Sequence, residues 1–100
     1  MDTKSKILDL AMNLTRIGNW AADGFADRKE KIRIFLKDTD QYFESLDKTR
    51  FPKNFAPTYT RFRNEYRLLR KDKNPKDPLA WAEKLLTWGN ILTHRASLLN

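Results

Sequence analysis

The sequence has no cysteine, only three glycines and a single histidine among its 100 residues. Without cysteine, the chain has no disulfide bonds, thiolate ligands or thiol nucleophiles, so packing must supply its stability. It contains no glycine-rich phosphate loop and no Gly-x-Ser-x-Gly motif. The histidine, His94, lies on the polar side of its segment, and the chain lacks the Glu-x-x-His pairs of di-iron bundles. We therefore expect no enzyme activity, metal site or cofactor.

Long hydrophobic runs are also missing. Charged side chains interrupt the apolar positions of the first 22 residues, which breaks the apolar region of a signal peptide, and no stretch is long enough to span a membrane. At 40% hydrophobic residues, the composition is nevertheless too apolar for a disordered chain. We expect a soluble, cytoplasmic protein with one domain over residues 1–100.

Apolar residues recur at helical spacing in four segments, near residues 3–21, 26–48, 58–72 and 78–98. No segment alternates with the two-residue period of a strand. The sequence therefore predicts an all-α protein, an antiparallel up-down four-helix bundle. The main buried positions are expected to be Ile7, Leu10, Ala11, Leu14, Ile17, Gly18, Ile32, Phe35, Leu36, Tyr42, Phe43, Leu46, Tyr59, Phe62, Tyr66, Leu69, Trp81, Ala82, Leu85, Trp88, Leu92, Ala96 and Leu99, with Leu79 and Leu86 widening the last stripe.

Local signals separate the four segments. Gly24 is expected to end the first helix in a left-handed conformation, and Asp27 with Glu30 approximates a capping box for the second. Thr58 is expected to cap the third helix after a loop that contains two prolines. Asp77 is expected to cap the fourth helix, because a proline follows it at the first helical position.

The first helix has the weakest start signal and no aromatic residue on its main apolar face. A three-helix core with a loosely attached first helix is therefore the alternative architecture. Gly89 lies on the apolar face of the fourth helix, where the absence of a side chain permits a close helix contact.

The net charge of +7 is concentrated in one stretch. Residues 48–76 hold ten lysines and arginines against only Glu65 and Asp72, whereas the remainder of the chain is nearly balanced. On a helical wheel, the third segment places four of these cations within an arc of about 100° that contains no carboxylate. They are Arg63, Arg67, Arg70 and Lys71, and Lys73 and Lys76 extend the charge beyond the helix end.

Unpaired arginines on one helix face are typical of a surface that binds anions, because the planar guanidinium fork matches phosphate and carboxylate oxygens. We predict an anion-binding site at Arg63, Arg67, Arg70, Lys71, Lys73 and Lys76. Aromatic residues interleave with these cations, but Tyr59, Phe62 and Tyr66 share the apolar face. We expect them in the core and not as platforms for nucleic-acid bases.

Internal pairing is the competing interpretation of the basic stripe. If the second and third helices are antiparallel neighbours, Asp40, Glu44 and Asp47 lie beside the first half of the third helix and neutralise its arginines. The same three carboxylates form a line that could hold a hard cation weakly. In this arrangement the remaining positive charge collects at the end of the bundle that holds the 72–78 loop.

Three tryptophans are unusual in a chain of this length. Trp20 and Trp81 are expected at the same bundle end as Phe25, where aromatics either seal the core or floor a small pocket beneath the basic loop. Trp20, Ile91 and Leu98 lie off the main apolar stripes, so they are candidates for a protein interface.

Two functions remain open from the sequence. The first is a small, non-catalytic binding protein whose basic third helix holds an anionic partner, either nucleic acid or an acidic protein surface. The alternative is a structural or homo-oligomerisation module, a homodimer for example, in which the basic charge serves only solubility.

Overall fold

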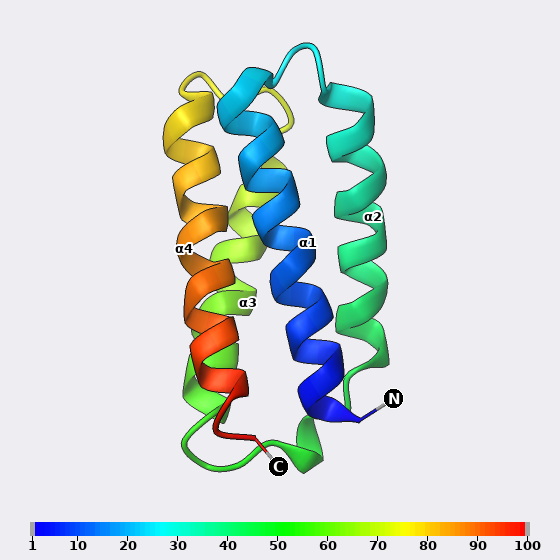
Figure 1. Ribbon diagram of the computed structural model, residues 1–100, viewed down its shortest axis with the longest axis vertical. Helices are drawn as coiled ribbons and strands as arrows, with labels where there is room; N and C mark the ends of the chain where they lie inside the picture. Colours follow the sequence, from blue (N-terminus) through cyan, green and yellow to red (C-terminus); the bar gives the residue numbers. More distant parts are fainter. Residues whose placement is uncertain (1, 100) are drawn as a thin grey trace.

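The computed structural model describes residues 2–99, and these residues form an up-down bundle of four helices without a strand (Figure 1). α1 comprises Thr3–Gly24, α2 Lys29–Ser45, α3 Ala56–Lys71 and α4 Pro78–Ala96, with a single 3-10 turn, η1, at Lys48–Arg50. The predicted all-α four-helix bundle is confirmed. Residues 1 and 100 of the predicted domain lie outside the described residues. Over the described residues, no helix has the length and apolar character needed to cross a bilayer.

Consecutive helices are antiparallel, so the bundle has two distinct ends (Figure 1). α1 begins and α4 ends at one end, together with the connection between α2 and α3. The connections α1–α2 and α3–α4 lie together at the opposite end. This arrangement brings residues 25–28 and 72–77 close together, although almost fifty residues separate them in sequence.

The core consists largely of the predicted stripes. All six stripe residues of α1 and all four of α3 are buried, as are the seven main positions from Trp81 to Leu99. Phe35, Tyr42 and Phe43 are half-buried, so α2 is packed less deeply. The prediction for Leu79 was wrong, because its side chain is 59% exposed near the start of α4.

α1 and α4 pack closely through their glycines. A Cβ atom at Gly18 would lie 2.7 Å from Leu86 Cγ, and one at Gly89 would lie 2.6 Å from Thr15 Oγ1. Each would also lie within 3.2 Å of a backbone carbonyl oxygen of the facing helix. The alternative of a loosely attached first helix was therefore wrong, because small residues replace aromatics as the means of close packing.

Two helix starts have side-chain caps. Asp77 Oδ1 accepts a hydrogen bond of 3.1 Å from the Ala80 amide, as predicted, and Asp2 Oδ1 accepts one of 2.7 Å from the Ser5 amide. The pKa of Asp2 is lowered, mainly by this hydrogen bond. The cap at Asp2 is the start signal that α1 lacked in the sequence interpretation.

Three other boundary predictions were wrong. Gly24 has no positive φ, because the chain continues from α1 in right-handed turns and the Arg28 amide donates to the Gly24 carbonyl at 3.1 Å. Asp27 does not cap α2, since the N-cap is Arg28 and Glu30 pairs with Arg33. α3 begins at Ala56 and not after Thr58, because proline is accommodated in the first helical turn.

Candidate anion-binding site

Most of the basic residues of α3 lie along its boundary with α2. Arg67, Arg70 and Lys71, with Lys73 beyond the helix end, line a hollow of about 440 Å³ in which Asp40 of α2 is the only carboxylate among the described residues. A second hollow of about 500 Å³ adjoins the first and shares Asp40, Tyr66 and Arg67 with it. We call the two together the α2–α3 groove. Its charged lining residues are six cations and two carboxylates: Lys48, Arg63, Arg67, Arg70, Lys71, Lys73, Asp40 and Glu44.

Among residues 2–99, Arg70 is the one α3 cation held by a carboxylate. Its Nη2 donates to Asp40 Oδ2 at 2.7 Å and its Nε to Asp40 Oδ1 at 3.2 Å, which is the paired geometry of an arginine and a carboxylate. The hydrogen bond to Asp40 raises the pKa of Arg70. This cation was predicted for the anion site, but in the structure it links α3 to α2.

Tyr66 joins the same network from the core. Its hydroxyl lies 2.8 Å from Asp40 Oδ1 and 3.1 Å from the Leu36 carbonyl oxygen. Burial raises the pKa of Tyr66, and the neighbouring Asp40 charge raises it further, so the phenol remains protonated and donates. Asp40 is therefore engaged by two residues of α3, which fixes the register between the two helices.

The other predicted cations have no acidic partner within the part of the chain that the structure describes. The ion pairs among residues 2–99 are Arg70–Asp40, Arg28–Asp23, Arg33–Glu30 and Arg50–Asp47. Within this part of the chain, no carboxylate oxygen therefore lies within 4.0 Å of Arg63, Arg67, Lys71, Lys73 or Lys76. Internal pairing accounts for Arg70 but not for the remainder of the stripe.

Lys76 lies outside the groove. It lines a different hollow of about 470 Å³ between the end of α3 and the start of α4, together with Lys84 and three carboxylates. Five of the six predicted anion-site residues are thus brought together along one groove, and Lys76 is not. Its position after α3, in the loop that turns toward α4, separates it from the others.

The aromatic residues of α3 serve the core, as expected. Phe62 is completely buried, and its ring centre lies 5.2 Å from that of Phe43 and 5.4 Å from that of Trp88. Tyr59 and Tyr66 also line the groove, but they are only 3% and 4% exposed. These two rings therefore offer the groove almost no surface for base stacking, and Phe43, which also lines it, is half-buried.

The Tyr59 hydroxyl is buried with no hydrogen-bond partner among the described residues. Burial raises the pKa of Tyr59, so the group is neutral at pH 7. Because an unpaired buried hydroxyl loses its hydration without compensation, we expect Tyr59→Phe to increase the free energy of unfolding by about 1 kcal/mol. Urea denaturation followed by circular dichroism measures the change. A loss of stability would show that the hydroxyl has a partner in solution.

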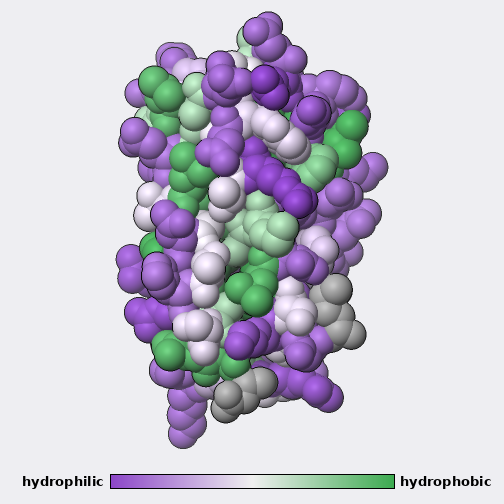
Figure 2. Space-filling view, in the orientation of Figure 1, coloured by the Kyte–Doolittle hydropathy of each residue, from purple (hydrophilic) through white to green (hydrophobic). Residues whose placement is uncertain are grey.

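The three interface candidates have different surroundings. Trp20 is half-buried: its ring meets Phe35 edge to face at 4.8 Å, and the Lys31 ammonium group lies 5.1 Å from its centre. Ile91 is half-buried against the core, whereas Leu98 is 59% exposed. On the face shown in Figure 2, hydrophilic residues predominate and hydrophobic residues gather in small, separate groups. The surroundings of Trp20, Ile91 and Leu98 do not test whether these residues contact another protein, so the interface stays a prediction.

The acidic line of α2 and the turn after it is divided between different partners. Asp40 is held by Arg70 and Tyr66, and Asp47 accepts a hydrogen bond of 3.1 Å from the Thr49 amide. The hydrogen bonds from Thr49 lower the pKa of Asp47. Residues 2–99 contain no group of three acidic or histidine side chains arranged to hold a metal ion.

Sequence reasoning missed Lys29. It lies on α2 at the bundle end that holds the 72–77 loop, and it lines a cavity there together with Arg33, Arg70 and Lys73. These four cations lie at the end where positive charge was expected to collect, but Arg33 and Arg70 are each paired with a carboxylate, and Asp72 lines the same cavity. No protein-family model, curated protein or solved structure matches the chain.

Proposed function

We propose that this protein binds a linear polyanion along the α2–α3 groove and carries out no chemistry of its own. The observation that supports the proposal is the row of Arg63, Arg67, Lys71 and Lys73, which share the groove and have no acidic partner within residues 2–99. A row of cations complements a partner that is itself a row of negative charges.

A single nucleic-acid strand is the polyanion that best fits this groove. Arg63, Arg67 and Lys71 follow one another at intervals of four residues, which is a rise of about 6 Å each along the helix. The groove follows the boundary between α2 and α3 as two adjoining hollows, so it accommodates one extended backbone more readily than a duplex. Arginine forks and lysine ammonium groups bind phosphate oxygens without reading the bases. Binding is therefore expected to be independent of nucleotide sequence.

The charge-reversal variant Arg67→Glu with Lys71→Glu tests this proposal. Both side chains are exposed and neither has an acidic partner among the described residues, so the fold and melting temperature should be retained. Fluorescence anisotropy with a labelled 20-nucleotide single strand should show at least a tenfold loss of affinity. In the unmodified protein, four phosphate contacts would give a slope of log affinity against log salt of about −2.8, and the variant should lose about half of it.

The matched control is Arg16→Glu with Arg95→Glu. It changes the net charge equally, but its two exposed residues lie on α1 and α4 and do not line the groove. If the control variant lost as much oligonucleotide affinity as the groove variant, net charge alone would explain the loss. The groove would then be refuted as the binding site. Stronger binding of polyglutamate than of the oligonucleotide at equal salt would replace nucleic acid with an acidic protein as the partner.

A further inference from the structure

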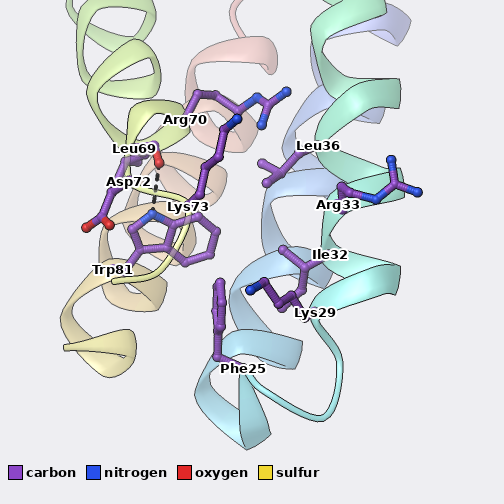
Figure 3. A pocket seen from close by; sticks show the side chains of 10 residues that line it. All are labelled: Phe25, Lys29, Ile32, Arg33, Leu36, Leu69, Arg70, Asp72, Lys73 and Trp81. Atoms are coloured by element: carbon purple, nitrogen blue, oxygen red, sulfur yellow. Dashed lines mark hydrogen bonds between the residues drawn. The ribbon is translucent and has the colours of Figure 1, made fainter. Parts of the chain in front are cut away.

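The end of the bundle opposite the chain termini contains an apolar cavity of about 260 Å³. Its apolar floor is formed by residues from different helices: Ile32 and Leu36 of α2, Leu69 of α3, Trp81 of α4, and Phe25, which directly follows α1. In Figure 3, Ile32 and Leu36 of α2 point toward Trp81 across the cavity, and Phe25 lies below. We call it the end cavity.

The aromatic wall of the end cavity is fixed in position. Trp81 Nε1 donates a hydrogen bond of 3.0 Å to the Leu69 carbonyl oxygen, shown by the dashed line in Figure 3. Its ring meets that of Phe25 edge to face, with centres 5.4 Å apart and planes at 89°. Because its one polar atom is satisfied, the indole presents an apolar surface to the cavity. A wall held in this way requires little ordering when a ligand binds.

The rim of the end cavity is cationic. Arg33 and Arg70 line it, but each is paired with a carboxylate of this chain, and in Figure 3 the Arg33 guanidinium points away from the cavity. Lys29 and Lys73 have no carboxylate within 4.0 Å among the described residues. Lys29 Nζ donates 2.7 Å to the neutral Asn74 Oδ1, which leaves two of its three donors unused. Asp72 also lines the end cavity, and in Figure 3 its carboxylate lies to the left of Trp81, away from Lys29.

We propose that the end cavity binds a small aromatic carboxylic acid, with its ring against Trp81 and its carboxylate on the unused donors of Lys29. A hydrocarbon floor with a few polar groups at its edge is the usual composition of a small-molecule site. The volume lies just below the usual range of about 300–1,000 Å³, so the ligand is of one- or two-ring size. A flat ring is favoured over a flexible chain, since stacking and edge contacts with fixed aromatic walls cost little conformational entropy.

This inference does not rest on the proposed polyanion function. Lys29, Ile32 and Trp81 do not line the α2–α3 groove, and Arg63 and Arg67 do not line the end cavity. Arg70 and Lys73 border both, so neither is used as a test position. Failure at either site is consequently visible without failure at the other.

The test is a titration followed by the three indole Nε1–H resonances in two-dimensional nitrogen–proton NMR spectra. The probes are 2-naphthoate, the neutral 2-naphthylmethanol and the straight-chain octanoate. We expect 2-naphthoate to shift the Trp81 resonance more than those of Trp20 and Trp88, and to bind at least tenfold more tightly than the alcohol. Lys29→Gln should weaken 2-naphthoate at least fivefold and leave the alcohol unchanged. Lys37→Gln, an exposed α2 lysine outside the cavity, should change neither.

Three outcomes would overturn the proposal. One is the absence of a shift at Trp81 with 2-naphthoate, and another is equal affinity for the acid and the alcohol. Tighter binding of octanoate than of 2-naphthoate would reassign the cavity to acyl chains. The Arg67→Glu, Lys71→Glu variant should bind 2-naphthoate within twofold of the unmodified protein, which distinguishes this site from the groove.

Discussion

Replacing both Gly18 and Gly89 by alanine is expected to lower the free energy of unfolding by about 4 kcal/mol. The new methyl groups would meet Leu86 at 2.7 Å and Thr15 at 2.6 Å, and the backbone carbonyls of Ala82 and Ala11 at 3.1 and 3.2 Å. A side chain can rotate away, but a carbonyl oxygen moves only with its helix, so α1 and α4 must separate. Overpacking of this kind costs about 1–3 kcal/mol at each site.

Intrinsic helix propensity predicts the opposite result. Each glycine-to-alanine change within a helix favours folding by up to about 1 kcal/mol in the absence of a steric conflict. Gly24→Ala is the matched control, because its Cβ would have no neighbour closer than 3.7 Å and its backbone has no positive φ. Urea denaturation should therefore show a less stable double variant and an unchanged or more stable Gly24→Ala. A double variant as stable as the parent would contradict the close α1–α4 contact.

Asp40→Asn is expected to weaken the fold and strengthen polyanion binding. Asparagine retains the shape and an oxygen that can accept from Tyr66, but it removes the negative charge that pairs with Arg70 and strengthens both hydrogen bonds. The loss of charge-assisted hydrogen bonds costs about 1.5–3 kcal/mol when buried, and the partial exposure of this pair places the expected loss near the lower end. At the same time, Arg70 becomes available to a ligand in the groove. The groove also loses Asp40, one of the two carboxylates that line it.

Two measurements on Asp40→Asn therefore change in opposite directions. Chemical denaturation should report the lower stability, and anisotropy should report an oligonucleotide affinity about threefold to tenfold higher, with a salt slope steeper by about 0.7 to 1.4. Glu44→Gln provides the comparison, because Glu44 lines the groove without an ion pair among the described residues. It should improve binding with little effect on stability. Weaker oligonucleotide binding by a folded Asp40→Asn would contradict the groove model.

The buried faces were predictable because helical spacing alone specifies which residues share a side. Leu10, Leu14, Phe62 and Leu85 are fully buried at positions that their stripes indicated. Helix ends were harder, since several local solutions compete. Asp27 is a residue type that commonly caps helices, yet Arg28 occupies the N-cap position of α2, and Glu30 pairs with Arg33 instead.

The place of α1 could not be inferred from residue size. Its stripe lacks aromatics, which suggested weak attachment, but glycine and alanine allow two helices to approach more closely than large side chains do. Gly89 had indicated a close contact on α4. The complementary role of Gly18 depends on the rotation of α1 about its axis, which only the assembled bundle determines.

The site was predictable in its composition but not in its pairing. The α3 stripe followed from sequence, whereas the partner of each carboxylate depended on the register between α2 and α3. That register brings Asp40 to Arg70 and not to the arginines in the first half of α3. Lys29 was missed because it lies more than forty residues before Lys73, and antiparallel folding alone places them at one cavity.

The most direct test of the central claim is backbone amide NMR mapping with a 20-nucleotide single strand. If a polyanion lies in the α2–α3 groove, the largest shifts should occur at Lys48, Arg63, Arg67, Lys71 and Lys73, and should diminish as salt is added. Residues on the outer faces of α1 and α4, such as Arg16 and Arg95, should change little. Shifts centred on α1 and α4, or none at low salt, would contradict the account.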